Sequence, residues 1–137
     1  MNTQKIKVTI DKQLSEVTVK YNLENLSMRF SEADNFKKIY KGKDIYDCLA
    51  KIRADFPHIT FLCKGSKINV MPSRMASQMS AGLVAYEMKL GKQASRDDIV
   101  NIFEYEENDL TNNPQQQIEF FKNWLKSLGA EDYEKFN

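Results

Sequence analysis

Histidine and cysteine are the scarcest chemistry-bearing residues in this chain of 137 residues, which has one histidine and two cysteines. Histidine is the commonest acid–base catalyst near neutral pH, and zinc sites draw mainly on histidine and cysteine. His58 has no nucleophile or base fixed beside it by the sequence, while Cys48 and Cys63 lie in apolar contexts typical of buried free thiols. We therefore predict no catalytic residue, no metal and no cofactor, and we do not expect an enzyme.

Glycine motifs and long apolar runs are also missing. The five glycines are not spaced as a phosphate-binding loop or as a dinucleotide fingerprint. No apolar run approaches the roughly 18 to 20 residues that span a bilayer. The first ten residues, MNTQKIKVTI, are a polar leader into alternating residues and do not resemble a secretion signal. We therefore expect a cytoplasmic protein that does not enter membranes.

An excess of charge of either sign is absent as well, because 20 Lys and Arg residues are balanced by 19 Asp and Glu residues, for a formal net charge of +1. Nucleic-acid binding normally rests on a clearly basic face, so this balance argues against nucleic acid as a partner. Hydrophobic residues make up 42% of the chain and charged residues 28%, as in ordered globular proteins. The length fits one domain over residues 1–137.

The sequence does contain clear hydrophobic periodicity in its first half. Apolar and polar residues alternate over 5–10 and again over 17–21, which predicts a β-hairpin with its turn near residues 11–15. A third, short alternation over 26–30 is expected to continue the sheet. Over 44–56 the apolar residues recur at steps of three and four, which predicts a helix capped by Asp44 and ended by the following proline.

Two strand-like runs follow this helix. Residues 58–63 and 67–71 are short and apolar, and Gly65 lies between them. Because glycine readily takes the positive φ that tight hairpin turns require, the pair predicts a second hairpin.

The remaining segments complete the predicted fold. Over 73–91, Met75 and Met79 recur with other apolar residues at helical spacing, which predicts one long helix whose methionines face the core. Residues 99–103 are typical of a strand buried on both faces, and residues 113–129 predict a final helix started by an Asn-Pro pair. The expected order is ββ(β)αββαβα, an α+β fold in which β-hairpins form a mainly antiparallel sheet packed against about three helices.

Residues 36–43, FKKIYKGK, form a basic segment with Lys37, Lys38, Lys41 and Lys43 around two aromatic residues. Lysines contact phosphate and aromatic rings stack on bases, so the segment predicts a nucleic-acid surface as an alternative function. The same composition is also typical of a solvated loop whose two aromatic residues belong to the core.

Residues 104–109, EYEEND, form an acidic segment. An acidic patch favours contact with a basic protein surface, since complementary charge accelerates association and fixes the register of binding. Two other interpretations remain open at this stage. The segment is also typical of a solvated loop, and its carboxylates, together with Arg74, are compatible with a small hydrolase or transferase.

One stretch of the chain resembles a known family. LCKGSKINVMPSRMASQMSAGLVAYEMKLGKQASRDDIVNIF, residues 62–103, has a Gly-Ser turn, NV-x-PS-x-M, GL-x-AY-x-x-x-LGK and a final VNIF. This pattern resembles immunity proteins of bacterial polymorphic-toxin and contact-dependent growth inhibition systems. The resemblance covers about a third of the chain. The family pattern often has a tyrosine before Pro-Ser and a glycine after it, where this chain has Met71 and Arg74.

The resemblance implies a binding protein with no catalysis of its own, whose partner is a cognate toxin domain. Many such toxins attack nucleic acids and carry basic clefts, so the acidic segment is the expected contact surface. Tyr105 is expected to anchor the contact, because exposed aromatic residues are enriched among binding hot spots. The predicted toxin-binding residues are Glu104, Tyr105, Glu106, Glu107 and Asp109.

Overall fold

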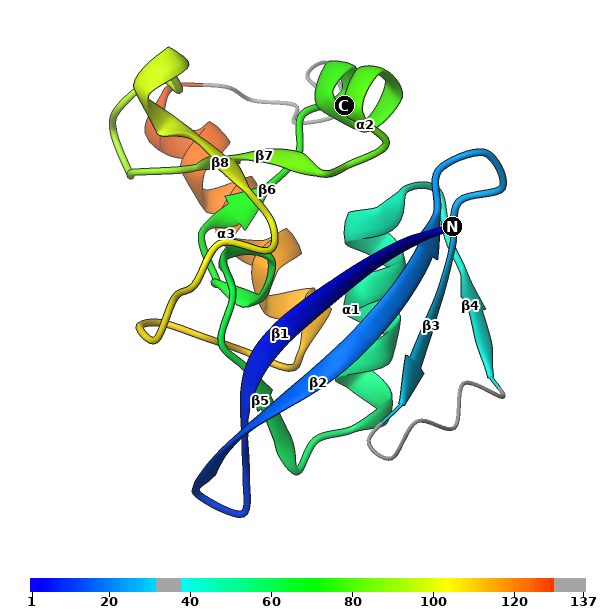
Figure 1. The fold of residues 1–137 in the computed structure, drawn as a ribbon. Coiled ribbons are helices and arrows are strands. Elements are labelled where there is room, and N and C mark those ends of the chain that lie inside the picture. The colour runs from blue at the N-terminus through cyan, green and yellow to red at the C-terminus, as the bar shows by residue number, and fades with distance from the viewer. Residues whose placement is uncertain (32–37, 130–137) are drawn as a thin grey trace.

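The structure is a computed structural model that describes residues 1–31 and 38–129 (Figure 1). Its N-terminal hairpin forms as predicted. Strands β1 (Asn2–Ile10) and β2 (Gln13–Asn22) pair antiparallel, and β3 (Ser27–Ser31) pairs with β2. The two loop residues of the hairpin, Asp11 and Lys12, have φ of 51° and 67°. Positive φ at both positions is what a two-residue turn of the primed type requires.

Two short strands complete a five-stranded antiparallel sheet in the order β4-β3-β2-β1-β5. They are β4 (Ile39–Lys41), which the sequence did not predict, and β5 (Ile59–Phe61). Helix α1 (Ile45–Asp55) lies against one face of this sheet (Figure 1). The Asp44 side chain accepts a hydrogen bond from the Asp47 amide, which confirms the predicted cap.

The predicted second hairpin is wrong. Strand β5 pairs with β1, whereas β6 (Val70–Met71) pairs with β7 (Val84–Glu87) in a separate three-stranded sheet. A single 3-10 turn, η1 (Lys64–Ser66), joins β5 to β6. Gly65 is needed there for space and not for a positive φ, because an added Cβ would lie 2.9 Å from Leu49 Cδ2. Tertiary packing against α1 therefore prevents the local turn.

The predicted long helix over 73–91 is also wrong. Helix α2 (Arg74–Ser80) is capped by Ser73 as expected, but Ala81 and Gly82 then take φ of 55° and 77° and the chain turns into β7. The Ile45 amide donates to the Ala81 carbonyl over 2.7 Å, which fixes this reversal against the start of α1. The methionine stripe does not reach the core, since Met75 is 68% exposed and Met79 is 81% exposed.

Strand β8 (Ile99–Asn101), preceded by the 3-10 turn η2 (Arg96–Asp98), forms where a strand was predicted, but it is not buried on both faces. It is an edge strand, paired only with β7, and Ile99 is exposed. Of the predicted run 99–103, only Ile102, the residue directly after β8, is completely buried. The apolar run alone did not distinguish a central strand from an edge strand.

The C-terminal helix α3 (Pro114–Ser127) is confirmed, with Asn113 accepting from the Gln115 amide at its start. Trp124 and Leu125 are buried together with Met88. Within the described ranges, no helix is both long enough and apolar enough to cross a membrane.

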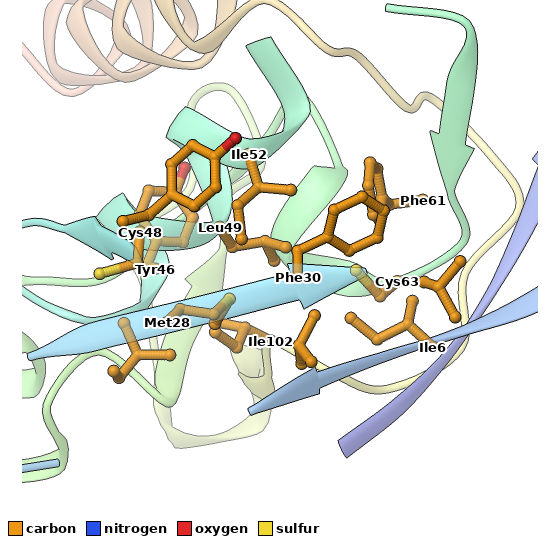
Figure 2. Close-up of a cluster of buried hydrophobic side chains, with 14 of the residues drawn as sticks. Ile6, Met28, Phe30, Tyr46, Cys48, Leu49, Ile52, Phe61, Cys63 and Ile102 are labelled. Atoms are coloured by element: carbon orange, nitrogen blue, oxygen red, sulfur yellow. The ribbon is translucent and has the colours of Figure 1, made fainter. Parts of the chain in front are cut away.

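The main core lies between the five-stranded sheet, α1 and the residues after β8 (Figure 2). Phe30 meets Phe61 and Phe56 edge-on, with ring centroids 5.5 and 4.8 Å apart. Both cysteines are buried free thiols, as predicted. The fold is therefore α+β, and its order matches the predicted one once β4 and β7 are added.

Candidate functional site

The acidic loop, residues 104–109, lies along residues 62–67 and is held there by backbone hydrogen bonds. The Lys64 amide donates to the Glu104 carbonyl over 2.8 Å, and the Glu106 amide donates to the Leu62 carbonyl over 3.3 Å. Isolated β-bridges join Cys63 to Tyr105 and Lys67 to Leu110. The loop is thus fixed to the turn between β5 and β6 at several points.

A half-buried group of four charges fixes the middle of the acidic loop. Glu106 Oε1 lies 2.9 Å from the ammonium groups of both Lys64 and Lys67. Glu87 Oε1 lies 2.8 Å from Lys64 and 3.5 Å from Lys67. The other Glu106 oxygen accepts from the amides of Glu107 and Asn108. The two carboxylates and two ammonium groups therefore neutralise each other while shaping the loop.

These contacts change the acidity of the carboxyl groups. Burial would raise the pKa of Glu106, but the hydrogen bonds from Lys67 and Lys64 and from two backbone amides outweigh it and lower the pKa to about 2. Burial opposes the same effect at Glu87, where hydrogen bonding and charge from Lys64 still lower the pKa. Both carboxylates are therefore fully ionised at neutral pH.

The other predicted contact residues point outward. Glu104, Glu107 and Asp109 are exposed, and Tyr105 is 55% exposed. The Tyr105 hydroxyl donates to Glu107 Oε2 over 3.1 Å. Glu106 differs from the prediction, because its side chain is buried and its carboxylate is engaged by lysines of its own chain. It supports the loop from inside and does not lie on its surface.

The basic segment over 36–43 lies partly outside the described residues, which exclude Phe36 and Lys37. Tyr40 is buried, and its hydroxyl donates to Asp55 over 2.8 Å. Lys38 pairs with the same carboxylate at 2.7 Å. The Tyr40 ring therefore belongs to the core, as the second interpretation of this segment held, and is not exposed for stacking on a base.

A groove that the sequence did not predict lies beside α2. Two hollows of about 370 and 260 Å³ share Met71, Pro72 and Ser73 as their common wall. The larger one is bordered by α1 and α2, and the smaller, apolar one by Tyr86, Phe121 and Trp124. The exposed Met75 lies on α2 directly after Ser73 and Arg74. The residues that line the groove come from distant parts of the chain, so no local sequence pattern marks it.

His58 lies on the surface after α1, with its ring 6.1 Å from that of Phe56. Among the residues that the structure describes, no three His, Cys, Asp or Glu side chains are grouped so as to hold a metal ion. No protein family matches this chain, and no curated protein matches its sequence significantly.

Proposed function

We propose that this chain is an immunity-type binding protein that neutralises a cognate bacterial toxin domain in the cytoplasm by direct contact, without catalysis of its own. The acidic loop is the proposed contact surface, with Glu104, Tyr105, Glu107 and Asp109 facing the toxin. Glu106 acts indirectly, by holding the loop in shape.

The observation that carries this proposal is the fixed shape of an exposed acidic loop. Its outward carboxylates surround an exposed tyrosine, while Glu106 and the backbone bridges tie the loop to the domain. Binding a loop that is already ordered costs less conformational entropy than binding a mobile one. A tyrosine that is rigidly presented among charges of one sign is suited to anchoring a basic partner surface.

The exposed methionines support binding in a second way. Met75 and Met79 present flexible, polarisable thioethers to solvent on a short helix beside the groove. Methionine surfaces of this kind adapt to the shape of a partner, and exposed apolar side chains gathered on one face mark interaction sites. Met75 and Met79 are therefore a second, apolar candidate contact surface, separate from the acidic loop.

The proposal is tested by identifying the genes that flank this one and co-expressing the chain with any toxin domain that they encode. Growth rescue by the native chain and loss of rescue by the Glu104→Lys, Glu107→Lys double variant are expected, since reversed charges repel a basic cleft. Glu24→Lys with Glu119→Lys is the matched control, because both residues are exposed, lie outside the loop and change the net charge equally. Equal rescue by both double variants would remove the acidic loop from the interface, and no rescue by the native chain would overturn the function.

A further inference from the structure

Within residues 1–31 and 38–129, no helix packs on one of the two faces of the five-stranded sheet. Ile6 and Val8 of β1 are buried against the core, so strand alternation directs Lys5 and Lys7 to the opposite face. Figure 1 shows β1 and β2 in front of α1, and no helix is drawn in front of these two strands. We call this opposite side the outer sheet face.

The register of the strands gathers cations on the outer sheet face. Lys5 of β1 lies opposite Thr18 of β2, and Lys20 of β2 lies opposite Arg29 of β3. Lys41 of β4 is opposite Ser27 of β3. The outward strand positions thus carry five cations and one carboxylate, namely Lys5, Lys7, Lys20, Arg29, Lys41 and Glu16.

Among the described residues, few carboxylates neutralise the charges of Lys5, Lys7, Arg29 and Lys41. Lys5 and Glu16 approach to 3.8 Å, but both are well exposed, and such pairs contribute little. Among the described residues, Lys7, Arg29 and Lys41 form no ion pair. Like charges that lie directly opposite on neighbouring strands repel each other. An anion held between Lys20 and Arg29 would be attracted by both.

The near-neutral total charge conceals this arrangement. The cations of the outer sheet face are balanced by carboxylates elsewhere, including the exposed ones of the acidic loop. The net charge of the chain therefore does not reveal the basic outer sheet face. Electrostatic attraction of a partner depends on how charge is distributed over the faces of the protein.

The other side chains on the face indicate which anion fits. Thr3, Thr9, Thr18 and Thr60 occupy outward positions beside the cations. Lysine, arginine and threonine are the side chains that contact nucleic-acid phosphates. No aromatic residue occupies an outward position of the five described strands of this sheet, so the face lacks the rings that stack on single-stranded bases. Two exposed apolar side chains, Leu14 and Ile39, do occupy outward positions, both near the edges of the basic group.

We propose that the outer sheet face binds the phosphate backbone of double-stranded nucleic acid without reading its sequence. This inference does not depend on the toxin-binding proposal, because the two surfaces differ in residues and in sign of charge. It also moves the proposed nucleic-acid contact from the basic segment over 36–43 to the sheet, where Lys41 of that segment joins Lys5, Lys7, Lys20 and Arg29.

Fluorescence anisotropy with a short labelled DNA duplex tests the proposal across a salt series. Three to five phosphate contacts predict a slope of log affinity against log salt of about −3 to −5. The Lys5→Gln, Lys7→Gln, Arg29→Gln variant is expected to bind at least about tenfold more weakly at low salt, with a shallower slope. The variant Lys89→Gln, Lys92→Gln, Lys126→Gln changes the net charge equally at exposed positions outside the sheet and is expected to bind like the native chain.

Three results would overturn the proposal. The first is that the native chain does not bind the duplex at low salt, and the second is that the control variant loses as much affinity as the first triple variant. The third is that polyglutamate at matched charge displaces the duplex, which would identify an acidic protein as the partner. Circular dichroism of each variant confirms that it is folded. If the first triple variant does not fold, the Lys20→Gln, Lys41→Gln pair replaces it, and unchanged binding by that pair overturns the proposal equally.

Discussion

Arg53 Nη2 donates to Gln117 Oε1 over 2.7 Å, joining α1 to α3 across 64 residues of sequence. Another guanidinium nitrogen donates to the Thr111 carbonyl, and Gln117 in turn donates to the carbonyls of Gly65 and Lys67. Arg53 is fully buried and burial lowers its pKa, while its Nε has no hydrogen-bond partner. A buried cation is thus held by neutral oxygens, which makes the fold depend on Gln117.

Replacing Gln117 with leucine is expected to destabilise the protein by about 3 to 5 kcal/mol. The substitution leaves a buried charge short of a partner and two carbonyls without their donor. Gln115→Leu, on the exposed side of the same helix, is the control and is expected to change stability by less than about 0.5 kcal/mol. Urea denaturation followed by circular dichroism measures both. A loss below about 1 kcal/mol for Gln117→Leu would contradict the role assigned to it.

Stability is expected to fall in acid because of the Glu106 network. The pKa of Glu106 is lowered from 4.5 to about 2 in the folded state. A carboxyl group with a depressed pKa stabilises the fold above its unfolded pKa, and this contribution is lost as the pH falls toward the folded pKa. Unfolding free energies measured from pH 6 downward should therefore drop between about pH 4.5 and 2.

The Glu106→Gln variant separates this group from the other acids. It is expected to be less stable at neutral pH, because the charge-assisted bonds to Lys64 and Lys67 are weakened, and to show a smaller loss in acid. Glu104→Gln, in the same loop but exposed, should keep the native pH dependence. If the unfolding free energies of both variants fall with decreasing pH as steeply as that of the native chain, the Glu106 network does not control stability in acid.

Parts of the fold could be predicted because their signals are local. The first hairpin shows clear alternation, and α1 and α3 carry their caps in the sequence, so each element is specified within its own residues. The α2 region differs because a tertiary contact decides it. The apolar spacing over 73–91 continues through Gly82, but that glycine packs against Asp44 and the helix ends there.

The candidate surfaces could be predicted only in part. The acidic loop was visible as a run of charges, but no run shows that Glu106 turns inward to Lys64 and Lys67, since those lysines lie about 40 residues away. The outer sheet face was readable in principle from the alternation around Lys5, Lys7 and Lys20. Its significance depends on strand register, which places Arg29 and Lys41 beside them and which local pattern does not fix.

The two kinds of methionine should respond differently to substitution. Met75 and Met79 are exposed, so replacing both with serine is expected to change the unfolding free energy by less than about 1 kcal/mol. Met28 is 1% exposed in the core, and Met28→Ala is expected to cost about 2 to 5 kcal/mol. Thermal and urea denaturation distinguish the two cases. A large loss in the serine double variant would place α2 in a buried interface and remove its thioethers from the proposed contact surface.

Gly82 and Gly91 form a matched pair that isolates the contact ending α2. Their φ angles are +77° and +78°, but a Cβ at Gly82 would lie 2.6 Å from Asp44 Cγ, whereas a Cβ at Gly91 meets nothing within 4 Å. Gly91→Ala therefore adds only backbone strain, about 1 kcal/mol. Gly82→Ala adds the same strain and also displaces the buried carboxylate that caps α1 and accepts from Ser77. Gly82→Ala should therefore lower the free energy of unfolding by about 1 to 3 kcal/mol more than Gly91→Ala, as measured by urea denaturation. Equal losses would show that the Asp44 side chain moves aside without loss of stability and that its contact with Gly82 does not end α2.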